Sequence, residues 1–181
     1  MEQVLNIKPL LKIKPLYNDT QVPVRAHPGD SGADVFAHNI KRLYKEVYFT
    51  GEGRELCIES SVNNISLYFP LSLKPGDRAL VGTGIAATVG KGYEIQARSR
   101  SGIPLKVGVI VGNSPGTIDE PFRSEIGIIL INTSNFLQTF EKGDRIAQIV
   151  VAPVIIPDMV IVEELDETDR GDGGFGSTGI K

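Results

Sequence analysis

The sequence predicts an all-β protein, and three features carry that prediction. Apolar residues alternate with polar ones or form short runs, as at 78–89 and 145–156. Turn signals rich in Gly and Pro separate these runs, and HPGDSG at 27–32 and KPGD at 74–77 are the clearest. No stretch keeps a helical period through three turns. We therefore expect short antiparallel strands arranged as a sandwich or jelly roll.

The expected strands follow one another along the chain. Their residue ranges are 11–16, 57–69, 78–89, 93–99, 126–132 and 145–156. The segment NSPGTIDEPFRSEIG at 113–127 looks like a hairpin that turns at Pro115–Gly116 and leads into the buried strand at 126–131. The stretch RSRSG at 98–102 is expected to be a loop. These assignments account for most of the body of the chain.

Composition limits what the chain can be. With 181 residues, of which 41% are hydrophobic, it fits one β domain, which we place at residues 1–168. The net charge is -3 without a basic stripe, so we expect no nucleic-acid partner. The apolar runs are too short to cross a bilayer, so no membrane contact is expected. Because Cys57 is the only cysteine, no intrachain disulfide can form, and a cytoplasmic location is expected.

The two histidines carry no sign of a metal site. His27 and His38 lack a Cys or His at a spacing that would complete a zinc site. We expect both in surface loops. A metal bound directly by protein side chains is therefore not predicted.

The C-terminus differs in kind from the body. Residues 169–181 are rich in glycine and have too little apolar area to offset the entropy of ordering. A frayed end is the simpler interpretation. A flap ordered by a ligand is the other, because Arg170 suits a phosphate, Phe175 can stack on a base, and Ser177 and Thr178 offer hydroxyl groups.

Two internal segments offer groups for ligand chemistry. The arginines, hydroxyls and glycine of RSRSG at 98–102 suit an anion, although such strings are common in ordinary turns. Asp119 and Phe122 lie three residues apart, and together they suit a sugar held between a carboxylate and a ring. Asp119 is equally suited to forming a turn. Neither segment alone decides a function.

Five motifs in order resemble those of the trimeric dUTPases. They are SGADVFA at 31–37, RSG at 100–102, GNSPGTIDEPFRSEIG at 112–127, GDRIAQIV at 143–150 and RGDGGFGSTG at 170–179. The resemblance covers most of the chain from about Leu11 to Gly179. It implies an antiparallel jelly roll with a mobile C-terminal arm. It also implies hydrolysis of dUTP to dUMP and pyrophosphate by a homotrimer whose subunits share the active sites.

The resemblance also implies roles for individual residues. Asp119 matches the aspartate that activates the attacking water and contacts the sugar 3′-hydroxyl. Phe122 matches the aromatic residue that packs on deoxyribose and leaves no room for a 2′-hydroxyl. Asp34 matches an aspartate that supports the phosphate and metal region, and a structural role is equally compatible. The remaining substrate-binding residues that the motifs imply are Arg100, Ser101, Gly102, Asn113, Gly116, Thr117, Ile118, Gln148, Arg170, Phe175, Gly176, Ser177 and Thr178. Mg²⁺ is expected as the cofactor, held by the triphosphate and water without direct protein ligands.

The chain departs from the family pattern in a few places. Phe122 stands where tyrosine is usual, Ser99 replaces a proline, and Ser124 replaces a glycine. The segment 38–70 is about twenty residues longer than the usual connection, and its alternation around TGEG predicts an added hairpin or an enlarged loop. It is either a surface feature or a partner-binding element.

Two alternatives remain beside a dUTPase. A dCTP deaminase, or a bifunctional deaminase and dUTPase, shares the fold and part of the phosphate loop, but Phe122 and the complete C-terminal motif favour the hydrolase. A non-catalytic regulatory protein on the same scaffold predicts at least one lost catalytic position, and Asp119, Arg100 and Arg170 are all present. The sequence does not distinguish a cellular source from a viral one, for which the host cytosol or nucleus is the expected location.

Overall fold

The computed structural model describes residues 8–48, 54–59, 69–169 and 171. Within these residues the chain consists of antiparallel strands and one short helix, α1 (Gly102–Val107). The strands are β1 (Lys12–Pro15), β2 (Ala33–Phe36), β3 (Asn39–Tyr48), β4 (Arg54–Glu59), β5 (Leu71–Leu73), β6 (Arg78–Gly82), β7 (Ile85–Thr88), β8 (Tyr93–Arg98), β9 (Val109–Val111), β10 (Gly116–Ile118), β11 (Gly127–Asn132), β12 (Gln138–Phe140) and β13 (Arg145–Pro153). The predicted all-β class is confirmed.

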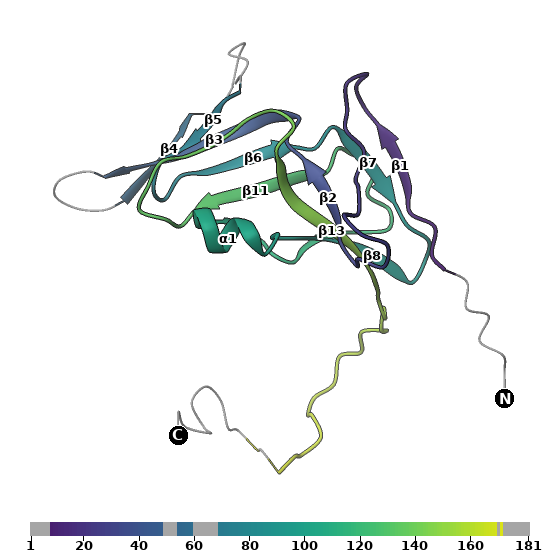
Figure 1. Cartoon of the computed structure of the whole chain (residues 1–181). Coiled ribbons are helices and arrows are strands. Elements are labelled where there is room, and N and C mark those ends of the chain that lie inside the picture. The colour runs from purple at the N-terminus through teal and green to yellow at the C-terminus, as the bar shows by residue number, and fades with distance from the viewer. Residues whose placement is uncertain (1–7, 49–53, 60–68, 170, 172–181) are drawn as a thin grey trace.

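Two larger sheets form the body, as Figure 1 shows. One has four strands in the order β10-β8-β13-β2, and the other has five in the order β4-β3-β6-β11-β9. The smaller pairs β1-β7 and β12-β5 complete the body. Apart from β3 and β4, neighbouring strands in these sheets are not consecutive in the chain, as expected for a jelly-roll-like fold.

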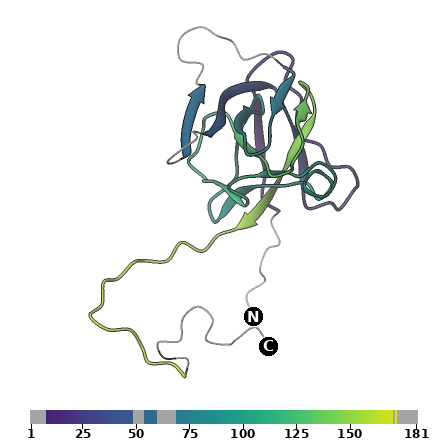
Figure 2. The same cartoon turned by 90° about the vertical axis from the view of Figure 1, so that its left-hand side faces the viewer.

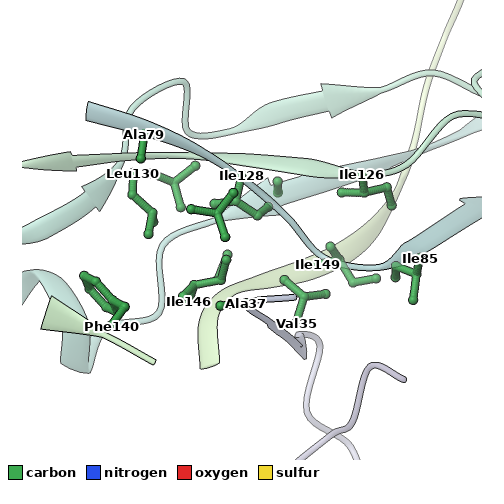
Figure 3. Packing of buried hydrophobic residues seen from close by; sticks show 14 of the residues in the cluster. Val35, Ala37, Ala79, Ile85, Ile126, Ile128, Leu130, Phe140, Ile146 and Ile149 are labelled. Carbon is green, nitrogen blue, oxygen red and sulfur yellow. The ribbon is translucent and has the colours of Figure 1, made fainter. Parts of the chain in front are cut away.

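The core lies between the two larger sheets. Alternate residues of β11 point inward, so Ile128 and Leu130 are buried, while Ile129 is only half-buried. Ile146 and Ile149 of β13 face them from the other sheet, as Figure 3 shows. Full burial of each such side chain stabilises the fold by about 1.5–3 kcal/mol. This core fixes the strands that carry the candidate site.

The hairpin predicted within 38–70 is present in the described residues. β3 and β4 pair antiparallel from Leu43↔Glu59 to Tyr48↔Arg54, and β3 also pairs with β6. The hairpin therefore extends the five-stranded sheet rather than standing apart from it. Residues 49–53 and 60–68 lie outside the described part of the chain.

The loop expected at 98–102 is present at residues 99–101, but helix α1, which was not predicted, begins at Gly102. It has six residues, too few to show the periodicity by which a helix is recognised in a sequence. Pro104 is tolerated because it lies in the first turn, where backbone N–H groups have no helical partner. Gly108 ends the helix with φ 70°, and its N–H donates to the carbonyls of Ile103 and Pro104.

The hairpin expected over 113–131 is wrong. β10 pairs with β8 in the four-stranded sheet, whereas β11 pairs with β6 and β9 in the five-stranded sheet. The chain therefore crosses from one sheet to the other between residues 118 and 127. This crossing segment carries Asp119 and Phe122.

The expectation for His38 is also wrong, whereas His27 is exposed as predicted. The His38 side chain is only 9% exposed, because its ring stacks on Tyr17 with 4.4 Å between the ring centroids. Its Nε2 lies 2.9 Å from an Asp19 carboxylate oxygen. Burial at this position comes from an N-terminal loop that folds back over it.

The chain leaves the body after β13. The strand ends at Pro153, three residues earlier than predicted, and Val154 N then donates to Gly92 O. Figures 1 and 2 show the following segment extending away from the sheets, and Ile155 and Ile161 on it are fully exposed. The mobile arm predicted at 169–181 lies mostly outside the described residues, so that domain division stays a prediction.

Candidate active site

Strand β13 brings three distant segments together around one cavity. Gln148 on β13 is opposite Asp34 of β2 on one side and opposite Arg98 of β8 on the other. The chain continues from β8 into Arg100, Ser101 and Gly102, and these residues line the cavity with Asp34 and Gln148. The cavity has a volume of about 780 Å³. It therefore gathers all the predicted phosphate-site residues that precede the C-terminal arm.

An ion pair fixes the arginine of this cavity. Arg100 Nε donates to Asp34 Oδ1 at 2.7 Å, and Arg145 Nη1 lies 3.5 Å from the other carboxylate oxygen. The Asp34 side chain is 13% exposed, so water screens the pair only in part. Asp34 thus holds two guanidinium groups at the mouth of the cavity.

Gln148 holds the backbone of the loop that follows β8. Its Nε2 donates to Ser99 O at 2.9 Å. Gly32 makes room for it, since a Cβ at position 32 would lie only 2.0 Å from Gln148 Oε1. Ser99 Oγ in turn accepts a hydrogen bond from Val111 N at 2.9 Å. Ser99 therefore connects the loop to buried strand β9.

The charges around the cavity are not all paired. Asp30 Oδ2 accepts from His27 N, and Asp144 Oδ2 accepts from Glu141 N, so these two carboxylates stabilise turns. Lys106 on α1 lines the cavity and has no carboxylate partner within the described residues. It is therefore available to an anionic ligand. Sequence reasoning missed Lys106, because its place at the cavity depends on a helix too short to predict.

The predicted nucleoside-binding residues lie elsewhere on the chain. β10 places Gly116 opposite Ala97, and a Cβ at Gly116 would come within 3.0 Å of Asn113 Nδ2. After β10, Phe122 N donates to Asp119 O in a turn, and the side chains of both residues are exposed. None of these residues lines the 780 Å³ cavity.

One chain therefore holds two separate groups of predicted site residues. Asn113 borders a cavity of about 390 Å³ beside Tyr44 and Arg78, and Asp119 borders another of about 400 Å³ beside Tyr93. The arm residues Arg170, Phe175, Gly176, Ser177 and Thr178 lie outside the described part of the chain. The roles of all these residues stay predictions.

The described residues offer no ready metal cage and no membrane span. Among them, no three His, Cys, Asp or Glu side chains lie close enough to hold an ion together. Over the same residues, no helix has the length and apolar character needed to cross a bilayer.

Comparison with known proteins decides the family. The family model described as dUTPase matches residues 61–179. The chain belongs to the dUTPase family. The deoxyuridine 5′-triphosphate nucleotidohydrolase of Hydrogenobaculum sp. is 43% identical over 171 residues, which cover 94% of this chain and 99% of that protein. The enzyme of the same name from Ehrlichia canis is 56% identical over 110 residues, covering 60% of this dUTPase and 72% of the relative.

A solved structure supports the fold of this dUTPase. The Staphylococcus bacteriophage 80alpha dUTPase with dUPNHPP has a TM-score of 0.70 and 25% identity, covering 94% of this chain and 99% of that one. The predicted family and the jelly-roll-like fold are thus confirmed.

Proposed function

We propose that this dUTPase hydrolyses dUTP to dUMP and pyrophosphate, with the triphosphate bound in the 780 Å³ cavity. The observation that carries the proposal is the register of β13, which gathers Asp34, Arg100 and Gln148 around that cavity. Arg100 supplies positive charge to the phosphates, while Ser101 and Gly102 supply hydrogen-bond donors. These groups stabilise the charge that develops when water attacks the α-phosphorus.

Asp119 is the residue proposed to activate that water. A carboxylate is needed because water becomes an effective nucleophile only when a base removes its proton. Asp119 is exposed, and the turn to Phe122 N fixes its backbone. It is thus accessible to a substrate that approaches from outside this chain.

Residues of β10 and its flanks are proposed to recognise the nucleoside. Asn113 and the backbone of 116–118 would hydrogen-bond uracil. Cytosine would leave buried groups of the site unpaired, so the site would discriminate against dCTP by about 10⁴-fold or more. Phe122 would pack on the deoxyribose. Phe122 is 37% exposed as a residue, so its ring is available for this contact.

A homotrimer with shared sites explains why the two groups of residues are separate. Asp119 does not line the cavity that contains Arg100 in the same chain. In a shared site, one subunit would supply the 780 Å³ cavity, and another subunit would supply Asp119 and the loop at 119–125. The arm with Arg170 and Phe175 would close over both. The exposed segment after β13 is long enough to carry the arm away from its own body.

Mg²⁺ fits this site as an ion carried by the substrate. The cavity carboxylates are already engaged, Asp34 with two arginines and Asp30 and Asp144 with backbone N–H groups. Mg²⁺ retains water and binds phosphate oxygens readily, so it needs few protein ligands. When bound, it would neutralise part of the phosphate charge. A cytoplasmic location stays part of the proposal.

Pyrophosphate release from dUTP tests the proposed reaction. We expect turnover of dUTP, little turnover of dTTP, dCTP or UTP, and loss of activity in Asp119→Asn. Asp158→Asn is the matched control, because Asp158 is an exposed aspartate outside both groups of residues. Equal turnover of the four nucleotides would sink the proposal, as would full activity of Asp119→Asn. Release of ammonia from dCTP would instead support a deaminase.

Complementation tests whether the sites are shared. Asp119→Asn and Arg100→Gln are each expected to be inactive alone. Coexpressed, they form mixed trimers in which some sites combine an intact Asp119 with an intact Arg100 from another subunit. We expect activity to return in part. No recovery from mixed trimers, with each variant folded, would show that each site lies within one chain.

A further inference from the structure

Glu125 is a buried carboxylate at the end of the nucleoside loop, which we define as residues 119–125. Its side chain is only 7% exposed. Oε1 accepts hydrogen bonds from Gly84 N and Asn39 Nδ2, both at 2.8 Å. Oε2 lies 2.6 Å from Lys41 Nζ. A carboxylate buried to this extent is fixed in position by the groups that donate hydrogen bonds to it.

The donors keep Glu125 ionised. Burial raises the pKa of Glu125, but the hydrogen bonds from Lys41, Gly84 N and Asn39 outweigh it and leave the pKa below its usual value. Gly82 leaves space for the group, since a Cβ there would lie 2.4 Å from Glu125 Oε1. The surrounding backbone is thus shaped around the carboxylate.

One end of the nucleoside loop is fixed to β3 and to the turn between β6 and β7 by these contacts and by the backbone of Ile126. Ile126 N donates to Ile85 O at 2.9 Å, and Thr83 N donates to Ile126 O at 3.1 Å. At the other end of the loop, Thr88 Oγ1 donates to Glu120 O at 3.1 Å. Both ends of the loop are therefore fastened to residues 83–88.

Phe122 lies between these two fastenings. The only hydrogen bonds of its own backbone within the described residues are the turn bond to Asp119 O and one accepted from Arg123 Nη1. The residue is 37% exposed and does not belong to the buried core. The place of the ring thus depends on where the ends of the loop are held.

We propose that Glu125 is a positioning residue for nucleoside selection, because it fixes the loop that presents Phe122. The inference rests on the proposed role of Phe122 against the deoxyribose. A 2′-hydroxyl is excluded only if the ring stays close to C2′, so a loop that shifts would admit UTP. Glu125 touches no substrate atom and acts through Phe122.

Glu125→Gln tests the inference. The amide keeps the size of the carboxylate, but its NH₂ group must face either Lys41 Nζ or the two donors Gly84 N and Asn39 Nδ2, which disrupts the network. We expect kcat/KM for dUTP to fall about tenfold, since small displacements of positioning groups have large effects on rate. We expect kcat/KM for UTP to fall less, so the dUTP to UTP ratio drops. Glu141→Gln, at an exposed glutamate in the β12–β13 turn, is the control and should keep the wild-type ratio.

Asn39→Ala provides a milder variant should Glu125→Gln fail to fold. It removes one donor and leaves Gly84 N and Lys41 in place, so we expect a smaller drop in the same ratio. Phe122→Ala separates this inference from the proposed function. If Phe122→Ala lowers the ratio but Glu125→Gln and Asn39→Ala only lower the melting temperature, the inference is wrong. If Phe122→Ala leaves the ratio unchanged, the proposed role of Phe122 is itself wrong.

Discussion

Arg100 and Asp34 form an ion pair in which Nε and Oδ1 are 2.7 Å apart, although the two residues are far apart in the sequence. The pair exists because β2 and β8 both flank β13 in the four-stranded sheet. Arg145, on β13 itself, approaches the same carboxylate at 3.5 Å. Asp34 therefore orients the guanidinium groups of Arg100 and Arg145 beside the 780 Å³ cavity.

Replacing Asp34 by Asn should weaken dUTP binding without unfolding the protein. The amide keeps the shape of the side chain but loses the charge that orients Arg100. We expect kcat/KM to fall about tenfold to a hundredfold, since a hydrogen bond to a charged group contributes about 1.5–3 kcal/mol. Steady-state kinetics of pyrophosphate release measures this, with Asp158→Asn as the control. Unchanged kinetics would show that Arg100 is held in place by other contacts.

Gly32→Ala should displace the Gln148 side chain from the backbone carbonyl of Ser99. The new Cβ would lie 2.0 Å from Gln148 Oε1, so the glutamine must move and give up its bond to Ser99 O. We expect kcat/KM to fall about tenfold, because the loop loses its fixed position. Gly90→Ala is the matched control, since a Cβ there would meet nothing within 4 Å. Equal activity in the two variants would contradict this role for Gln148.

Ser99→Ala should reduce the free energy of unfolding. Its Oγ is the acceptor for Val111 N, and Val111 is 3% exposed. Leaving that buried N–H without a partner costs about 1–3 kcal/mol. Urea unfolding would detect the change. Ser124→Ala, at an exposed serine, is the control and should stay within about 0.5 kcal/mol of wild type. An equal loss in the free energy of unfolding in both variants would show that the hydrogen bond from Val111 N makes no specific contribution to stability.

Structural features that depend on residues close in the sequence could be predicted, whereas features that depend on contacts between residues far apart in the sequence were missed. Alternation along β11 and β13 and the turn glycines are local signals, and those strands were found. The partner of β10 was not, because pairing with β8 or with a neighbour in sequence leaves the same local pattern. Lys106 was missed because α1 is too short to show a period. The burial of His38 was missed because Tyr17 covers it from another loop.

The candidate site shows the same division. The motifs identified Asp34, Arg100 and Gln148, and the structure places them around one cavity. They gave no sign that Gln148 would bond to Ser99 O, or that the Glu125 side chain would be buried among donors from β3 and from the turn between β6 and β7. Those contacts join strands that are brought together only by the sheet topology.

Acid should destabilise the protein partly through Asp19. The hydrogen bond from Lys142 Nζ at 2.6 Å and the contact with His38 lower the pKa of Asp19 from 3.8 to about 2. Because the folded state holds the carboxylate ionised, the stabilisation is fully present above about pH 5 and is lost as the pH falls from about 4 to about 2. The group is exposed, so added salt should weaken the effect.

Asp19→Asn isolates this contribution. We expect the free energy of unfolding of wild type to fall more steeply than that of the variant between about pH 4 and about pH 2, since Asn cannot titrate. The two slopes should match above about pH 5, and the difference at low pH should shrink at about 1 M salt. Urea unfolding at a series of pH values measures both curves. If the free energies of unfolding of wild type and variant stayed parallel down to about pH 2, the contacts with Lys142 and His38 would not stabilise the ionised Asp19 carboxylate more than water does.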